Sequence, residues 1–258
     1  MIQSFYSRVR KGHATGMRAV ILAGGRGVRL QPFTATFPKP LVPLGDTPVV
    51  EILIRRLQLF GVTDITLALG HLAELTRAYF YHRRPVLKGI HLRYVEEQKP
   101  TGTAGSLALI KDLNRTFLVL NGDLLTDLDF HALVSFHHKR KSLLTIATHR
   151  RHVKLDLGVL ELDSKKRVRA YREKPEKFYD VSMGIYVYEP SILSFIKPGK
   201  HLDFPELASK LINAGERVYA YPTECLWLDV GRPDDYARAQ KLFTNTSSDE
   251  ISPCLNFA

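Results

Sequence analysis

The sequence contains few cysteines and no long apolar segment. Cys225 and Cys254 are the two cysteines among 258 residues, and neither has a partner at the spacing of a C-x-x-C motif. Two such residues can form neither a disulfide framework nor a zinc site, which is typical of a protein from the reducing cytosol. No run approaches the roughly 20 apolar residues of a membrane span, and no apolar segment follows the basic residues near the start. We therefore expect a cytoplasmic protein that is neither secreted nor inserted into a membrane.

Acidic residues are scarce beside basic ones. The sequence contains 26 Asp and Glu residues and 37 Lys and Arg residues, which gives a formal net charge of +11. This excess favours a polyanionic partner, namely a nucleic acid, a nucleotide or an anionic surface. Residues 1–16 contain three basic residues, no acid and no periodic apolar pattern, so we predict a flexible basic extension there. Residues 244–258 are predicted to be a loose tail.

Between these ends, over 17–243, we predict a single domain in which strand-like and helix-like segments alternate. Such alternation is typical of a mostly parallel sheet with helices on both faces, which is a Rossmann-like α/β fold. Thr47 is expected to cap the helix 48–60. The strands are predicted at 18–23, 64–69, 90–95, 116–121 and 143–147, and the helices at 48–60, 72–82, 103–113 and 130–140. After about residue 150 the strands become shorter, near 156–162, 167–172, 182–188, 217–221 and 225–229, with helices near 190–196, 203–213 and 233–243.

A glycine-rich loop follows the first predicted strand. Gly24, Gly25 and Gly27 let backbone N–H groups approach phosphate oxygens without obstruction by a Cβ atom. Arg29 adds a forked phosphate donor, and Lys39 stands between two prolines that restrict its backbone. Ligands of open α/β sheets bind beyond the carboxyl ends of the strands, where this loop is predicted to lie. We therefore predict a triphosphate site made of Gly24, Gly25, Gly27, Arg29 and Lys39, and we assign Leu22 and Ala23 just before it to nucleotide binding.

Two common phosphate loops do not match this segment. A dinucleotide-binding fingerprint needs a glycine where Leu30 stands, and the Gly-Lys-Ser/Thr tripeptide of a P-loop is absent. Instead, the loop with Pro38-Lys39-Pro40 resembles the signature of the sugar-1-phosphate nucleotidyltransferases, G-G-x-G-T-R-L-x-P-L-T-x-x-x-P-K-P, with Val28 in place of Thr and Phe33 in place of Leu. The similarity continues along 17–243 and is greatest to short members of the mannose-1-phosphate guanylyltransferase type. It implies a glycosyltransferase-A-like fold, with a nucleotide-binding part at about 17–150 and a smaller sugar-phosphate-binding α+β part at about 151–243.

Two aspartates are predicted at strand ends on the same edge of the sheet as this loop. Asn121-Gly122-Asp123 closes the strand 116–121, and Asp229 closes the strand 225–229. Nucleotidyl transfer brings two anions together, and Mg²⁺ commonly binds one or two carboxylates together with phosphate oxygens. In the resembled family the residues that match Asp123 and Asp229 hold this metal. The alternative is that each aspartate caps a helix or a turn.

The segment from Glu96 to Leu107 leads from a strand into a helix and is rich in small residues. Small residues let a flat base lie against the backbone, where exposed amides can bind its edge. The segment resembles the E-x-P-L-G-T-A-G sequence of guanylyltransferase-type members, with Thr101 in place of the usual Leu. The resemblance implies a nucleotide-binding role for Gln98, Gly102 and Thr103, and Gly122 joins this set. The alternative is that this segment is only the start of a helix, made more flexible by its glycines, with no role in binding.

An acidic and a basic residue stand side by side in Glu173-Lys174-Pro175. The carboxylate can bind sugar hydroxyls, and the ammonium group can bind a phosphate. The segment matches the E-K-P motif of the family, in which the Lys contacts the sugar phosphate and the Glu contacts the sugar ring. The family's N-A-G-I-Y segment has Ser182 and Met183 in place of Asn and Ala. The resemblance implies a sugar-phosphate site made of Gly158, Glu173, Lys174, Ser182 and Gly184, and the alternative for the Glu-Lys pair is a solvated surface.

The sequence thus predicts an enzyme that makes a nucleotide-sugar and pyrophosphate from a nucleoside triphosphate and a sugar 1-phosphate. Arg29, Lys39 and Asp123 are the predicted catalytic residues, and Mg²⁺ is the predicted cofactor. GTP with mannose 1-phosphate or a related sugar is the first choice, and thymidylyl, cytidylyl or uridylyl transfer to glucose 1-phosphate is the alternative. An alternative of another class is a catalytically silent subunit that binds a nucleotide-sugar and regulates a partner. No nucleic acid or membrane partner is predicted, and homo-oligomer formation stays open.

Overall fold

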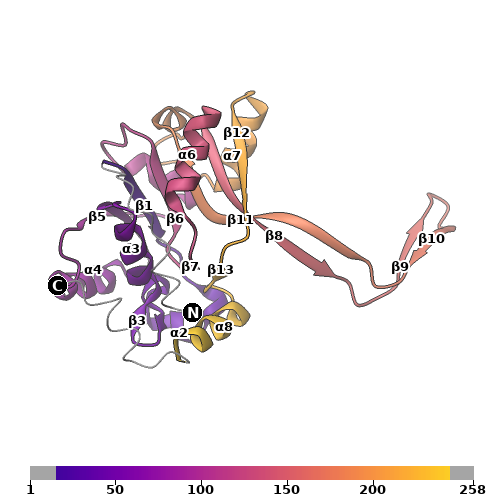
Figure 1. Cartoon of the computed structure of the whole chain (residues 1–258), viewed down its shortest axis with the longest axis horizontal. Helices are drawn as coiled ribbons and strands as arrows, with labels where there is room; N and C mark the ends of the chain where they lie inside the picture. The colour runs from indigo at the N-terminus through magenta and orange to yellow at the C-terminus, as the bar shows by residue number, and fades with distance from the viewer. Residues whose placement is uncertain (1–15, 245–258) are drawn as a thin grey trace.

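A seven-stranded sheet forms the centre of the computed structural model, which describes residues 16–244 (Figure 1). The strand order is β12-β8-β11-β6-β1-β4-β5. β11 runs antiparallel to both of its neighbours, and the other neighbouring strands are parallel, which confirms the predicted α/β sheet. The strands are β1 (Arg18–Ala23), β4 (Asp64–Leu69), β5 (His91–Glu96), β6 (Phe117–Asn121), β8 (Leu144–Lys154), β11 (Glu176–Tyr188) and β12 (Val218–Thr223).

Helices cover both faces of this sheet because the side chains of its inner strands alternate between two cores. Ala19 and Ile21 of β1 belong to a core with residues of α3 (Val49–Leu59), α4 (Ala73–Arg83) and α6 (Phe130–Arg140). Val20 belongs to a second core, with residues of α7 (Phe204–Asn213) and of two 3-10 helices, η3 (Ser106–Leu109) and η4 (Pro190–Phe195). The carboxyl ends of β1 and β6 remain accessible, because Leu22, Ala23 and Asn121 line an open cleft.

A third core fixes the chain that follows β1 against the C-terminal helix. Leu30, Val42 and Leu44 pack with Leu228 and Ala239. Residues of η1 (Val28–Leu30), β2 (Pro43–Leu44), β7 (Leu124–Thr126), β13 (Trp227–Asp229) and α8 (Pro233–Thr244) contribute to this core. The other short elements between β1 and α3 are α2 (Phe33–Thr36), η2 (Lys39–Leu41) and β3 (Thr47–Pro48). In the described part of the chain, none of the helices combines the length and the apolar character that crossing a membrane would require.

Several element boundaries differ from the sequence prediction. Thr47 does not cap α3, because it lies in β3 and its hydroxyl donates to the Asp46 carboxylate at 3.0 Å. The predicted helix 103–113 is only α5 (Gly102–Gly105) followed by η3. The backbone N–H groups of Ala104 and Gly105 both donate to the carbonyl of Leu202 at 3.0 Å, which holds this segment as tight turns against another loop. The predicted extension 1–16 lies outside the described residues except for residue 16, and the tail lies outside except for residue 244.

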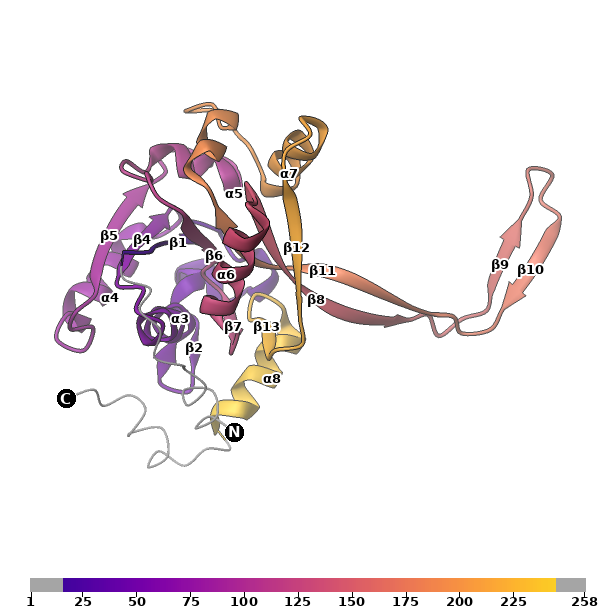
Figure 2. The same cartoon turned by 45° about the horizontal axis from the view of Figure 1, so that its top comes forward.

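The largest difference is an arm, defined as residues 150–180, that projects from the body of the molecule (Figures 1 and 2). The prediction ended one strand at 147 and began another at 182, whereas β8 continues to Lys154 and β11 begins at Glu176. These two strands stay paired along the arm, from Arg150 with Asp180 to Lys154 with Glu176. A two-stranded hairpin of β9 (Val159–Leu162) and β10 (Val168–Arg172) forms its tip.

Candidate functional site

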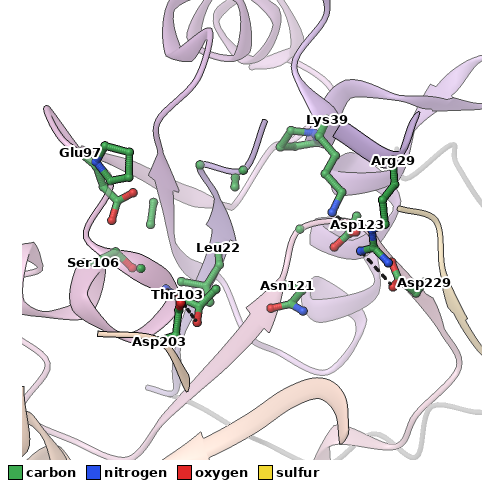
Figure 3. A pocket seen from close by; sticks show the side chains of 18 of the residues that line it. Leu22, Arg29, Lys39, Glu97, Thr103, Ser106, Asn121, Asp123, Asp203 and Asp229 are labelled. Atoms are coloured by element: carbon green, nitrogen blue, oxygen red, sulfur yellow. Dashed lines mark hydrogen bonds and ion pairs between the residues drawn. The ribbon is translucent and has the colours of Figure 1, made fainter. Parts of the chain in front are cut away.

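A cleft of about 390 Å³ opens at the carboxyl ends of β1 and β6 (Figure 3). These strands are parallel neighbours, with Leu22 beside Asn121, and the N–H of Gly122 donates to the Leu22 carbonyl at 2.9 Å. The antiparallel pairing of β13 with β7 places Asp229 opposite Leu124, next to Asp123. The topology therefore brings the glycine-rich loop and both predicted metal carboxylates to one cleft, whose lining includes the predicted residues Leu22, Ala23, Gly24, Gly25, Arg29, Lys39, Gly102, Thr103, Gly122, Asp123 and Asp229.

Gly27 does not line the cleft, but it determines how the loop folds. Its φ of 64° lies in the left-handed region that glycine tolerates best. Its carbonyl accepts a hydrogen bond from the buried Thr34 hydroxyl at 2.6 Å, and a Cβ atom on Gly27 would lie 2.9 Å from Thr34 Cγ2. Gly27 thus allows the close packing that turns Arg29 toward the cleft.

Two ion pairs connect the basic residues of the loop to the aspartates. Lys39 Nζ lies 2.5 Å from Asp123 Oδ2, and Arg29 Nη2 lies 3.6 Å from Asp229 Oδ2 (Figure 3). Asp123 is buried, whereas Arg29 is largely exposed at the mouth of the cleft. Two cations that face an open, glycine-lined surface are suited to the oxygens of a polyphosphate.

Burial and the negative charge of Asp123 together raise the pKa of Asp229 to about 6, although Lys39 and Arg29 act in the opposite direction. Two carboxylates this close repel each other when both are ionised. A divalent cation between them would relieve that repulsion, so the pair fits Mg²⁺. In the described residues no group of three or more His, Cys, Asp or Glu side chains is placed to hold a metal. Further ligands would therefore come from phosphate oxygens or water, which is the usual arrangement for Mg²⁺.

The opposite end of the cleft is made by two loops that are 100 residues apart. Asp203 Oδ1 accepts hydrogen bonds from the N–H of Thr103 at 3.0 Å and from its hydroxyl at 3.2 Å. Gly102 has a φ of 82°, and a Cβ atom there would lie 2.5 Å from the Leu202 carbonyl oxygen. Of the three residues of this segment predicted to bind nucleotide, Gly102 and Thr103 line the cleft, whereas Gln98 is exposed and does not line it.

The five predicted sugar-phosphate residues fall into two places. Gly184 lies beside the cleft, since a Cβ atom on it would be 2.5 Å from Nδ2 of the cleft residue Asn121, and its N–H donates to Ser182 Oγ at 3.3 Å. The other three, Gly158, Glu173 and Lys174, flank the hairpin on the arm, outside the cleft (Figures 1 and 2).

The three arm residues form a cluster of their own. The Tyr171 hydroxyl donates to Glu173 at 2.8 Å, and a Cβ atom on Gly158 would lie 2.1 Å from the same hydroxyl oxygen. Lys174 Nζ pairs with Asp156 at 2.8 Å. The structure therefore keeps the three residues together but does not bring them to the cleft of their own chain.

Several cleft residues were not predicted as site residues. Asn121 was within reach of the prediction, because it directly precedes the Gly122-Asp123 motif. His201 and Asp203 carry no local signal, because only the contact with the loop of Thr103 places them in the cleft. The lining residues that the prediction missed are Pro40, Ala68, Glu97, Pro100, Ser106, Asn121, His201 and Asp203.

A mostly parallel sheet with a glycine loop, paired cations and paired carboxylates at its carboxyl edge defines an α/β protein of the nucleotide-binding class. Residues 18–246 match the family profile described as nucleotidyl transferase. The chain therefore belongs to the nucleotidyl transferase family, and the resemblance to sugar-1-phosphate nucleotidyltransferases is confirmed.

Relatives from distant organisms support this assignment. The chain is 33% identical to the UTP–glucose-1-phosphate uridylyltransferase of Synechocystis, and the match covers 86% of this chain and 62% of that protein. It is 31% identical to the mannose-1-phosphate guanyltransferase of Schizosaccharomyces pombe, with 89% of this chain and 65% of that protein covered. The chain thus spans less than two thirds of the length of these two curated relatives.

Solved structures share the fold. HddC from Yersinia pseudotuberculosis, solved alone and complexed with GMP-PN, superposes with a TM-score of 0.68 at 26% identity. The superposition covers 88% of this chain and 99% of HddC.

Proposed function

We propose that this protein transfers a nucleotidyl group from a nucleoside triphosphate to a sugar 1-phosphate. The observation that carries the proposal is the convergence of Arg29, Lys39, Asp123 and Asp229 with the glycine loop in one cleft. An oxygen of the sugar phosphate attacks the α-phosphorus, a new oxygen–phosphorus bond forms, and the bond from the α-phosphorus to the β-phosphate oxygen breaks. Pyrophosphate leaves, and a nucleotide-diphosphate-sugar remains.

The reaction needs no nucleophile from the protein, because the attacking phosphate oxygen is already anionic. Positioning and charge neutralisation therefore supply the catalysis. Arg29 and Lys39 neutralise the β- and γ-phosphates as pyrophosphate leaves, and the glycine loop binds the triphosphate through its backbone. Asp123 and Asp229 would hold Mg²⁺, which supplies charge neutralisation at the triphosphate when bound. On the arm, Lys174 is assigned to the sugar phosphate and Glu173 to the sugar ring.

GTP with mannose 1-phosphate or a related sugar is the proposed substrate pair. The guanylyltransferase-like segment before Leu107, the names of the mannose-1-phosphate guanyltransferase relatives and the GMP-PN complex of HddC support GTP. Uridylyl, thymidylyl or cytidylyl transfer to glucose 1-phosphate remains the alternative, because another relative is named a uridylyltransferase. The scarcity of cysteine supports a cytoplasmic location.

The proposal is tested by a grid of nucleoside triphosphates against sugar 1-phosphates with Mg²⁺, and pyrophosphate release is measured. We expect release from at least one pair and none after the metal is removed with EDTA. Lys39→Ala and Asp123→Ala should each lower kcat by about 100-fold or more without loss of the folded state. Lys111→Ala, at an exposed position outside the cleft, is the control and should retain full activity. A grid without pyrophosphate release would refute the enzymatic function.

A further inference from the structure

The arm exposes an unusual amount of apolar surface. More than half of the large apolar side chains that are exposed in the described residues lie on it: Val153, Leu155, Leu157, Leu160, Leu162, Val168, Tyr171, Phe178 and Tyr179. Water-exposed apolar surface that is gathered on one element marks an interaction site. In the body the exposed large apolar residues are spread over several elements, such as Leu75 and Tyr81 on α4 and Ile212 on α7.

The hairpin at the tip has one apolar face. Leu160 pairs with Tyr171, and Leu162 pairs with Val168, and residues that are paired in this way project from the same side of the ladder. These four side chains are 49% to 63% exposed. β9 and β10 pair only with each other among the described strands, and a lone two-stranded hairpin is marginally stable in water. The apolar face therefore requires a partner surface.

The ribbon that carries the hairpin prevents its own body from being that partner. The ladder from Arg150 to Lys154 extends about 15 Å before the hairpin begins. His152 stacks on Phe178 with ring centroids 4.8 Å apart, and Glu176 bonds to His152 at 2.9 Å. These contacts oppose the bending of the ribbon that would bring the base of the hairpin back to the cleft of its own chain.

Charge identifies the partner surface. Four acidic residues line the cleft, Glu97, Asp123, Asp203 and Asp229, whereas Arg29 and Lys39 are the only Lys or Arg in the lining that the structure describes. Both cations are already paired with aspartates on the side of the glycine loop. The arm contains ten Lys and Arg against six Asp and Glu between residues 150 and 180. A second phosphorylated substrate therefore lacks a cation in the cleft, and the arm supplies one in Lys174.

We propose that the chain forms a twofold symmetric dimer in which each arm completes the cleft of the other copy. The apolar face of the hairpin is buried on the partner body, and Glu173 and Lys174 enter the partner's cleft beside its glycine loop. Exchange of identical arms creates two equal sites in one closed dimer. The proposal rests on the function proposed above, since it assigns the arm residues to the sugar 1-phosphate.

The oligomeric state tests the exchange without any need for turnover. Light scattering on the full chain should give roughly twice the monomer mass of 29.3 kDa. The double variant Leu160→Asp and Tyr171→Asp should give a monomer with an unchanged circular dichroism spectrum, because both side chains are exposed in the single chain. Leu75→Asp on α4, also exposed, is the matched control and should remain a dimer. A monomeric wild-type protein would overturn the proposal.

Mixed dimers test whether the cleft is completed in trans. Lys174→Ala and Asp123→Ala are each expected to be inactive alone. When the two variants are co-expressed in equal amounts, half of the dimers contain one chain of each. One cleft in each of these mixed dimers then combines an intact body with an intact arm. Activity should therefore return to about one quarter of the wild-type value. Lys39→Ala mixed with Asp123→Ala should stay inactive, because both changes affect the same part of the body.

Failure of the proposed function and failure of the arm exchange would give different results. If the wild-type protein releases no pyrophosphate from any substrate pair, the proposed function fails, while the mass measurement still decides whether arms are exchanged. If the wild-type protein is an active dimer and the mixed dimers are no more active than the single variants, the function stands and completion in trans is refuted.

Discussion

Gly231 and Gly25 differ in what an added side chain would meet: Gly231 lies against the Lys39–Asp123 pair, and Gly25 lines the cleft. A Cβ atom on Gly231 would lie 2.5 Å from Asp123 Oδ2 and 2.8 Å from Lys39 Nζ. A Cβ atom on Gly25 would have no protein atom within 4 Å. Gly231 therefore gives room to the ion pair itself, whereas the space above Gly25 is open to a ligand.

The first prediction follows from this difference. Gly231→Ala should displace the Lys39–Asp123 pair by a fraction of an ångström or more and lower kcat/KM by about 10- to 100-fold. Gly25→Ala should leave the unliganded protein unchanged and weaken nucleotide binding. Calorimetric titration with the nucleotide and thermal unfolding of the unliganded variants separate the two effects. Unaltered turnover in Gly231→Ala would show that the position of the ion pair does not matter for catalysis.

The motif residues of the cleft could be predicted because each stands in a short local pattern that carries a chemical signal. The loop from Gly24 to Arg29, Lys39 between two prolines, and the aspartates after strands all line the cleft or shape it. Asp203 could not be predicted, since its position depends on a hydrogen bond to Thr103 across 100 residues. The position of Lys174 away from the cleft depends on the length of two strands, which no local motif specifies.

At the level of elements, a buried carboxylate joins two helices on one face of the sheet. Glu51 of α3 is fully buried and pairs with Arg55 at 2.5 Å and with Arg83 of α4 at 2.8 Å. The Tyr79 hydroxyl of α4 donates to the same carboxylate at 2.5 Å. Burial raises the pKa of Glu51, but its hydrogen bonds with Arg83, Tyr79 and Arg55 outweigh burial and leave the pKa below its ordinary value of 4.5.

The second prediction concerns stability. Glu51→Gln leaves two arginines without their anion and should lower the free energy of unfolding by about 3 kcal/mol at neutral pH, measured by urea denaturation. Because the pKa of Glu51 is lower in the folded state, its stabilisation is complete above pH 4.5 and is lost as the pH falls through the folded-state pKa. The difference between wild type and Glu51→Gln should therefore shrink below pH 4.5. Glu74→Gln, at an exposed position of α4, should change the free energy of unfolding little at any pH. An equal loss of stability in both variants would contradict a role for the buried network.

Element order was predictable where a strand or helix buries a regular apolar pattern, and α6 was predicted with the observed bounds 130–140. The helix 103–113 was predicted wrongly, because its apolar residues pack as two short turns whose N–H groups bond to Leu202. The continuation of β8 and β11 into the arm was missed for another reason. Residues 150–154 and 176–180 are exposed or half-buried and rich in charge, so they lack the apolar alternation that identifies a half-buried strand.

At the level of the whole molecule, the body and the arm are separate in their packing. The three hydrophobic cores contain no residue of the arm. The contacts of the arm with the body are at its base, where Arg151 lies 3.8 Å from Asp235 and over the ring of Trp227. We therefore expect the body to fold without the hairpin, and we expect the exposed apolar surface of the arm to act through contacts outside its own chain.

The third prediction concerns a shortened chain that lacks the hairpin and keeps the rest of the molecule intact. Lys154 and Glu176 are paired across the ladder, so a two-residue Asn-Gly turn can join them in place of residues 155–175. The free energy of unfolding of the shortened chain should lie within about 1 kcal/mol of the wild-type value, because the chain loses no core residue. It should bind the nucleoside triphosphate with unchanged affinity, sediment as a monomer and lack transfer to the sugar 1-phosphate. Full-length Lys174→Ala should also lack transfer but should remain a dimer, which separates loss of the cation from loss of the interface. A shortened chain that is monomeric and fully active would show that the cleft is complete without the arm.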